Sequence, residues 1–431
     1  MWLANSKPLN ARNIEEQLRL LRTSPLINDV TASLRPTGEV GKSLLIVTIE
    51  AAQALTFEAS TDNFSPPIIG SERIGGKLEY RNLLGFGDTI TGTYNHTTTG
   101  ESDTFDLNYN IPLNAMEGTL QLRTFISRSE FDQQVTLPII SEGQISLESF
   151  EVELNSDYEI YSLNYRQPII RSLREELAVS GGFTYRDGSP IEALQASGLP
   201  VILAEFFAEV GLDTGLQAIG VLGPDLNQDR TSVFNLGVDY VSRDPEGVWA
   251  LSSQFNVGTG IFDATIRPSP FADSRFFSWL FQAQRLQQIG TDNLLIMVGS
   301  LQLSPDSLLS SQQFVIGGGQ SIRGFRQNVR FGDNGFRFSI EDRITVARNG
   351  EGNSVFQVAP FLDLGQVWNN PDNQDLLRNK TFLGGLGFGL IFTPINNLSI
   401  RVDFALPLVD LEDRGENVQE EAVYFDVKYR L

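Results

Sequence analysis

Strict alternation of apolar and polar residues in the second half of the chain limits its fold more than any other feature. In residues 398–406 the apolar side chains share one face of an extended strand, while Arg401 and Asp403 lie on the other. The same period of two runs through 336–346 and 423–431, and it is the period at which side chains alternate across a β-strand. A dry core does not hold such charges unpaired. The alternation therefore favours a β-barrel with an apolar exterior and a wet lumen over a soluble β-sandwich.

Similar segments recur from residue 54 to the C-terminus, each near the roughly ten residues that a tilted strand needs to cross a bilayer. Short turns, such as 244–246, alternate with long connections at 130–156, 188–230, 304–334 and 407–420. Short turns at one rim and long loops at the other are typical of outer-membrane barrels. We therefore expect a transmembrane β-barrel of about 16 antiparallel strands. The expected strand starts are Ala54, Arg73, Asp88, Asp103, Gly118, Asp157, Glu175, Thr231, Gly247, Arg275, Asp292, Gly335, Ser354, Thr381, Asn396 and Glu421.

Composition excludes several classes of function. The 431 residues contain no cysteine and one histidine, His96, so neither a disulfide framework nor a cysteine-ligated metal site is possible. A formal net charge of −21 argues against a nucleic-acid partner, which would need clustered Lys and Arg. A hydrolase needs a base beside its nucleophile, and His96 stands among threonines at a predicted loop end. We expect no enzyme activity, no cofactor and no metal.

Residues 1–51 form a unit of a different kind from the barrel, which we place at 52–431. Apolar residues at helical spacing predict a helix over 13–22, and two short strands are predicted at 28–34 and 43–50. Such a small α+β unit buries little apolar surface by itself, so we expect that the N-terminus is incomplete. No basic region followed by an apolar stretch is present, so no signal peptide is visible.

The glycine-rich segment 317–326 lies within the long connection 305–334 and differs from the strands around it. Glycine loses more backbone freedom on ordering than other residues, so this segment favours neither strand nor helix. It carries Arg323, and an arginine inside a partly desolvated lumen needs a carboxylate. Parity places Asp363 and Glu341 on the lumen side of their strands. We therefore expect the segment to fold back into the barrel, with Asp363 as the first candidate partner of Arg323 and Glu341 as the second.

The strand that follows Asp363 offers a surface to receive this segment. Its residues Gly385, Gly387 and Gly389 face the lumen by parity, and inward glycines allow another backbone to approach closely. Two other interpretations of the segment are a plain surface loop and a phosphate-binding cradle. The cradle interpretation is weak because the segment lacks Gly-Lys-Ser/Thr and a strand–loop–helix context. The matching glycine trough favours the docked loop over the surface loop.

These motifs resemble those of a known superfamily. The segment 318–325 resembles the loop-six motif of the superfamily that contains BamA-like insertases and two-partner secretion transporters, and 361–368 resembles its companion strand motif. Residues 62–63 and 82–88 resemble the start of the barrel in transporters of the ShlB/FhaC/HecB type, and 8–50 is similar to the later part of their second POTRA domain. The likeness covers essentially the whole chain. The motif residues are Gly318, Gly319, Ser321, Ile322, Arg323, Gly324 and Phe325, with Phe361, Asp363 and Gly365 on the companion strand.

The resemblance implies a barrel with a partial N-terminal POTRA domain and an infolded loop six, 305–334, whose Arg323 pairs with Asp363. It also implies export of a large, partly unfolded exoprotein of the haemolysin or adhesin kind, without ATP, across the outer membrane of a Gram-negative-type bacterium. The expected partners are this exoprotein and outer-membrane lipid, and we expect a monomer. A client strand that adds to the edge of the N-terminal hairpin would contact Val47 and Ile49.

The chain also departs from this family pattern. The first POTRA domain, the opening of the second, the plug helix and the signal sequence are not seen, which puts the transport competence of this version in doubt. Leu431 stands where such barrels commonly end in Phe. Two rival functions stay open. An insertase that folds other barrels would carry more POTRA repeats, and a passive porin would show a large, steady conductance that depends on no client.

Overall fold

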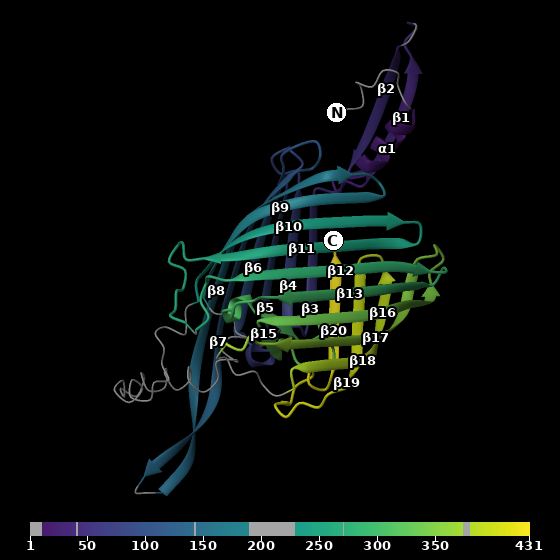
Figure 1. Cartoon of the computed structure of the whole chain (residues 1–431). Coiled ribbons are helices and arrows are strands. Elements are labelled where there is room, and N and C mark those ends of the chain that lie inside the picture. Colours follow the sequence, from purple (N-terminus) through teal and green to yellow (C-terminus); the bar gives the residue numbers. More distant parts are fainter. Residues whose placement is uncertain (1–10, 40–41, 142–143, 189–228, 270, 374–379) are drawn as a thin grey trace.

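The main body of the molecule is a closed antiparallel barrel of 16 strands (Figure 1). This computed structural model describes residues 11–39, 42–141, 144–188, 229–269, 271–373 and 380–431. The barrel strands are β3 (Leu55–Asp62), β4 (Arg73–Arg81), β5 (Thr89–Thr97), β6 (Ser102–Pro112), β7 (Thr119–Ser141), β8 (Gln144–Arg171), β9 (Glu175–Asp187), β10 (Thr231–Asp244), β11 (Gly247–Thr259), β12 (Phe277–Ile289), β13 (Asn293–Leu303), β16 (Asn334–Arg348), β17 (Ser354–Trp368), β18 (Phe382–Ile395), β19 (Leu398–Pro407) and β20 (Val423–Arg430).

Each barrel strand pairs with its neighbours along the chain, and β20 pairs with β3 to close the cylinder. All but one of the expected strand starts lie within two residues of an observed start, so the predicted 16-strand barrel is confirmed. Among the described residues, no helix is both long enough and apolar enough to cross a membrane.

Burial along the strands follows the alternation of the sequence. On β18 and β19 the aromatic side chains Phe388 and Phe404 are exposed on the outside and lie 5.5 Å apart between ring centroids. On β17 the alternate residues Phe361 and Asp363 are buried inside, at 3% and 0% exposure. An apolar surface outside and charged groups inside is the arrangement that a bilayer favours, because lipid solvates the first and not the second.

One predicted connection is a pair of strands instead. The sequence suggested a loop over 130–156, but β7 and β8 stay in register through this region, from Thr119 opposite Arg166 to Ser141 opposite Gln144. Figure 1 shows the resulting hairpin projecting well beyond the rim of the barrel. Residues 130–156 still contain β-branched residues, which favour extended strands: Val135, Thr136, Ile139, Ile140, Ile145 and Val152. The predicted connection 188–230 lies almost entirely outside the described residues.

The N-terminal unit consists of α1 (Ala11–Arg22) and the antiparallel hairpin of β1 (Ile27–Pro36) and β2 (Ser43–Ala51). The Arg22 side chain joins the helix to the hairpin, because its Nη2 donates to the Val30 carbonyl at 2.8 Å and lies 2.8 Å from an Asp29 carboxylate oxygen. Val30 is 4% exposed. The unit lies beyond the rim of the barrel opposite to the one from which the β7–β8 hairpin projects (Figure 1).

The apolar core of the molecule lies inside the barrel. The connection between β13 and β16 contains η3 (Ser310–Gln312) and a small hairpin of β14 (Phe314–Ile316) and β15 (Arg330–Gly332). A second short helix, η2 (Pro67–Ile69), follows β3. Apolar side chains of the β13–β16 connection pack against side chains of β17, β18 and the β19–β20 loop. The buried members of this cluster are Phe314, Ile316, Ile322, Phe325, Val329, Val367, Leu383 and Leu411.

Candidate functional site: the docking site of loop six

The connection 305–334, which we call loop six, carries apolar side chains that are buried against β17, β18 and the β19–β20 loop. Its tip is a compact turn in which Gly318 N donates to Ile322 O at 3.1 Å and Ser321 N donates to Gly318 O at 3.0 Å. Gly324 adopts φ +105°, and a Cβ there would lie 3.2 Å from the backbone of Pro407. The φ angle favours glycine because other residues rarely adopt it, and the nearby Pro407 backbone leaves little room for a side chain. The turn thereby directs Arg323 to the inner wall.

Arg323 binds the carboxylate of Asp363 on β17 through two nitrogens of its guanidinium. Nε donates to Oδ2 at 2.7 Å and Nη2 donates to Oδ1 at 2.9 Å. The backbone N–H of Arg323 adds a third hydrogen bond to Oδ2 at 3.1 Å. Arg323 is 6% exposed and Asp363 is 0% exposed. A bidentate pair in this environment holds the orientation of the loop as well as its position.

The second expected carboxylate, Glu341 on β16, also binds Arg323, so the two candidates act together. Nη1 of Arg323 donates to Oε2 of Glu341 at 2.7 Å. Glu341 in turn accepts from Arg343 at 2.8 Å and from Arg401 on β19 at 2.7 Å. Arg401 donates to Asp403 at 2.9 Å. We call this set of three arginines and three carboxylates the ion cluster: Arg323, Glu341, Arg343, Asp363, Arg401 and Asp403.

Arg401 and Asp403 were recognised as inward residues from the alternation, yet they were not assigned to the site. Their strand lies two positions along the sheet from Asp363, because β17 pairs with β18 and β18 with β19. Gly389 on β18 lies between these residues and β17. Its lack of a side chain leaves room for the Asp403 carboxylate, which a Cβ would overlap. Combining the alternation of side chains with the order of the strands in the sheet would have placed Arg401 and Asp403 at the site.

Two further residues complete the contacts of the Arg323 guanidinium. Its Cζ lies 3.3 Å from the ring centroid of Phe361, which is a cation–π contact. Ser339, which the sequence did not single out, donates from its hydroxyl to Oδ1 of Asp363 at 2.6 Å. Phe361 and Ser339 thus support the two ends of the Arg323–Asp363 pair.

The three inward glycines receive different groups. At Gly385 a Cβ would overlap the carbonyl oxygen of Arg323, so the loop backbone passes directly over this residue. At Gly387 a Cβ would come within 2.7 Å of the Phe361 ring. The backbone of loop six therefore comes closest at Gly385. At Gly387 a Cβ would also overlap the backbone carbonyl oxygen of Phe404 on the adjacent strand β19, and at Gly389 it would overlap the Asp403 carboxylate. Gly365 makes room for the Ile322 side chain, which would lie 3.1 Å from a Cβ.

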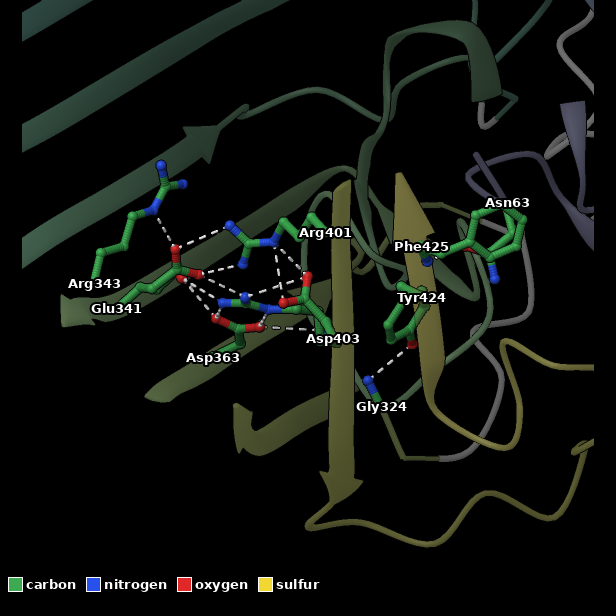
Figure 2. Close-up of polar contacts among 11 residues, drawn as sticks. Asn63, Gly324, Glu341, Arg343, Asp363, Arg401, Asp403, Tyr424 and Phe425 are labelled. Atoms are coloured by element: carbon green, nitrogen blue, oxygen red, sulfur yellow. Dashed lines mark hydrogen bonds and ion pairs between the residues drawn. The ribbon is translucent and has the colours of Figure 1, made fainter. Parts of the chain in front are cut away.

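Tyr424 on β20 holds the far side of the loop tip and was missed by the sequence reasoning. Its hydroxyl accepts from Gly324 N at 2.9 Å and donates to Phe325 O at 2.6 Å (Figure 2). Tyr424 is 1% exposed. Its position on the last strand offered no local signal, because alternation marks it as inward but not as a partner of the loop.

The base of loop six is anchored by a buried carboxylate outside the strands. Asp333 is 0% exposed and accepts from Leu308 N at 2.8 Å and from Asn370 N at 2.9 Å. Its burial raises the pKa of the carboxyl above its ordinary value of 3.8, although these hydrogen bonds act in the opposite direction.

The arrangement is suited to holding a loop in place. The three positive and three negative groups of the ion cluster are paired with one another. His96 lies at the end of β5, where its Nδ1 is 2.9 Å from Asp103. In the described part of the chain, no group of three His, Asp or Glu residues is placed to hold a metal ion. Val47 and Ile49 lie on β2 of the N-terminal unit and take no part in this site.

A family model and several known proteins match this chain. The model of the haemolysin secretion/activation protein family ShlB/FhaC/HecB matches residues 41–188 and 225–392. The outer membrane transporter CdiB of Escherichia coli is 24% identical over 412 residues, which are 94% of this chain and 62% of that protein. CdiB of Dickeya dadantii (strain 3937) is 22% identical over 336 residues, which are 76% of this chain and 52% of that protein. The chain therefore spans between about half and two thirds of these curated relatives.

Solved structures share the fold. CdiB from Escherichia coli superimposes with a TM-score of 0.72 at 18% identity, over 98% of this chain and 71% of that one. BamA from Haemophilus ducreyi, lacking POTRA domains 1–3, gives a TM-score of 0.58 at 13% identity, over 98% of this chain and 78% of that one. With the closed barrel and these outer-membrane relatives, the protein is an outer-membrane β-barrel. The family match covers most of its length, and the chain belongs to the haemolysin secretion/activation protein family ShlB/FhaC/HecB.

Proposed function

We propose that this protein is an outer-membrane pore that exports a large partner exoprotein in two-partner secretion. The observation that carries the proposal is the docked loop: in a barrel of this family, an infolded loop is held to the inner wall by a buried bidentate ion pair. The pore acts by passing an extended polypeptide and performs no catalysis. It works as a monomer in outer-membrane lipid and has no nucleic-acid partner.

In this proposal the Arg323–Asp363 pair holds loop six in a transport-competent position. Separating the pair would leave Asp363, at 0% exposure, without its counter-charge. Removing one partner of a buried pair costs about 3–5 kcal/mol, far more than a surface pair contributes. The docked position is therefore strongly preferred, and the surrounding wall is shaped for it at Gly385.

The test is secretion of the partner exoprotein by three variants. Arg323→Ala should abolish most export, and the exchange of Arg323→Asp with Asp363→Arg should restore part of it if the charge pair itself matters. Arg343→Ala is the matched control, because Arg343 binds Oε1 of Glu341, whereas Arg323 binds Oε2, and because the Arg343 side chain is 35% exposed. Normal export by Arg323→Ala, with the barrel folded and present in equal amount, would refute the proposed role.

We further infer that the N-terminal unit is the later part of a POTRA domain, which ends near residue 51 where the barrel begins, and that it receives the client. Among the described residues, β2 pairs only with β1, so one edge of β2 is available for an added strand. Val47 and Ile49 lie along this edge strand. Proline at Val47 should weaken export, and unchanged export would count against client binding here.

A BamA-like insertase is the second candidate, because the fold also matches BamA. Depletion of the protein separates the two functions. Loss of one exoprotein from the medium, with other outer-membrane barrels assembled normally, supports export, whereas a general loss of folded barrels supports the insertase. A large and steady single-channel conductance that does not respond to any client would instead identify a passive porin.

A further inference from the structure

The junction between the last and the first barrel strands, which we call the seam, has the shortest ladder of the barrel. Strands β20 and β3 pair at five positions, from Asp426 opposite Asp62 to Arg430 opposite Glu58. Strands β3 and β4 pair at eight, and β10 and β11 at thirteen. Because β3 ends at Asp62, the first residues of β20 extend past it without a strand partner on that side. The backbone N–H and C=O groups of these residues therefore need other hydrogen-bond partners.

The side chain of Asn63 takes the place of the missing strand (Figure 2). Its Nδ2 donates to Val423 O at 3.0 Å and its Oδ1 accepts from Phe425 N at 2.9 Å. Asn63 is 0% exposed. The carboxamide therefore supplies the two hydrogen bonds that a peptide group of a neighbouring strand would supply.

Gln419 then connects this end of the seam to loop six. Its Nε2 donates to Asn63 O and to Ser65 O, each at 2.6 Å, and its Oε1 accepts from Gln327 N at 2.8 Å. Gln419 is 0% exposed. One buried carboxamide thus joins three segments: the chain after β3, the chain before β20 and the segment of loop six just past Arg323.

Loop six also packs against both strands of the seam directly. Tyr424 of β20 binds Gly324 and Phe325, as described above. A Cβ on Gly319 would overlap the ring of Phe64, which follows β3, and would lie 2.9 Å from the ring of Tyr424. Loop six is therefore in contact with the segments on both sides of the seam.

We propose that Asn63 and Gln419 form a clasp that makes closure of the seam depend on the docked position of loop six. Withdrawal of the loop removes Gln327 N from Gln419 and leaves buried polar groups of the clasp unpaired, which is costly. Conversely, opening of the seam destabilises the docked position of loop six by the same free energy, because coupling between two sites is reciprocal. Gln419 and Asn63 are positioning residues in this scheme. The scheme does not depend on what the pore exports.

The experiment measures seam closure in the purified full-length protein by disulfide formation. The chain has no cysteine, so Thr61→Cys with Val427→Cys, which are register partners across the seam, provides a single reporter pair. Gln419→Leu in this background should slow disulfide formation about tenfold, on the scale of two or three lost hydrogen bonds. Gln313→Leu is the matched control: Gln313 is a buried glutamine within loop six whose Nε2 donates to Leu308 O of the same loop, and its loss should leave the rate unchanged.

Two further sets of variants test the coupling between loop six and the seam. Gln419→Glu retains the acceptor for Gln327 N but loses the donor to Asn63 and Ser65, so it should also slow the reaction. Arg323→Ala should slow the reaction when Gln419 is present but add little in the Gln419→Leu background, because coupled residues are non-additive. Folding of each variant is checked by heat-modifiable gel mobility. A parental rate in Arg323→Ala, or fully additive effects of Arg323→Ala and Gln419→Leu, would overturn the proposal.

Discussion

Two walls of the same lumen differ in chemistry, although both are built from strands with the same alternation. The docking wall, β16–β19, presents the ion cluster inward. A second wall, formed by β10–β13, presents mainly amides and apolar side chains to the lumen. The register identifies which of its residues face the lumen: Val298 pairs with Ser339, and Ser339 binds the inward carboxylate Asp363. Inward residues of β11–β13 that share this face are Val248, Ala250, Ser252, Gln254, Asn256, Leu280, Gln282, Gln284, Leu286, Gln288, Leu294, Ile296, Val298, Ser300 and Gln302.

The two walls differ in how their charges are held. The alternation predicts a wet lumen that accommodates charged side chains, but on β13 three alternate inward residues are apolar: Leu294, Ile296 and Val298. Charged residues also face the lumen away from loop six, as Arg166 and Asp239 do, but their side chains are 26% and 31% exposed. Beneath loop six the charged groups of Arg323 and Asp363 are buried and paired with each other. The docking wall therefore differs from the rest of the lumen in the burial of its charges beneath the loop, and not in having charges.

The largest expected effect comes from removing the central carboxylate of the docking wall. Asp363→Asn leaves Arg323 buried beside a neutral group and should lower the free energy of unfolding by about 3 kcal/mol. The matched change in the other wall is Asp239→Asn. Asp239 lies 3.4 Å from Arg166 and is 31% exposed, so its loss should cost less than about 1 kcal/mol. Urea unfolding of the detergent-solubilised barrel compares the two, and equal shifts would contradict the distinction between the walls.

The next effect is steric. Gly385→Ala places a methyl group where the Arg323 carbonyl lies, so the tip of loop six should move off the wall. Trypsin should then cleave after Arg323 or Arg326 about tenfold faster than in the parent protein, because local opening exposes the backbone. Gly299→Ala on β13 is the control, since its nearest neighbour would be 4.0 Å from the added Cβ. Parental protease resistance in Gly385→Ala would show that the wall adapts to the methyl group.

The smallest effect concerns the aromatic support of the guanidinium. Phe361→Leu keeps an apolar side chain but removes the ring 3.3 Å from Arg323 Cζ, and should cost about 1 kcal/mol. Phe125→Leu is the comparison, because Arg123 stands 5.5 Å from that ring and is 42% exposed. Unfolding in urea should show a larger loss of unfolding free energy for Phe361→Leu than for Phe125→Leu. The reverse order would mean that the ring contact contributes nothing beyond apolar packing.

The sequence by itself determined the barrel, most of its strand boundaries and the two ends of the Arg323–Asp363 contact. These follow from local rules: alternation assigns each residue to lipid or lumen, and an arginine within a glycine-rich loop calls for a carboxylate. Local rules failed where residues beyond the barrel still pair, as in the β7–β8 hairpin. On β13 the predicted strand is present, but its residues 294–298 are apolar on both faces, so alternation alone does not tell there which face meets the lumen.

Only the tertiary structure decided which distant residues meet. Arg401 and Asp403 join the ion cluster because two strand pairings bring β19 next to β17 across an inward glycine. Asn63 meets Phe425, and Gln419 meets Gln327, because closure of the cylinder places the first and last strands side by side. Closure and register depend on the whole sheet, so no single segment of sequence encodes these contacts.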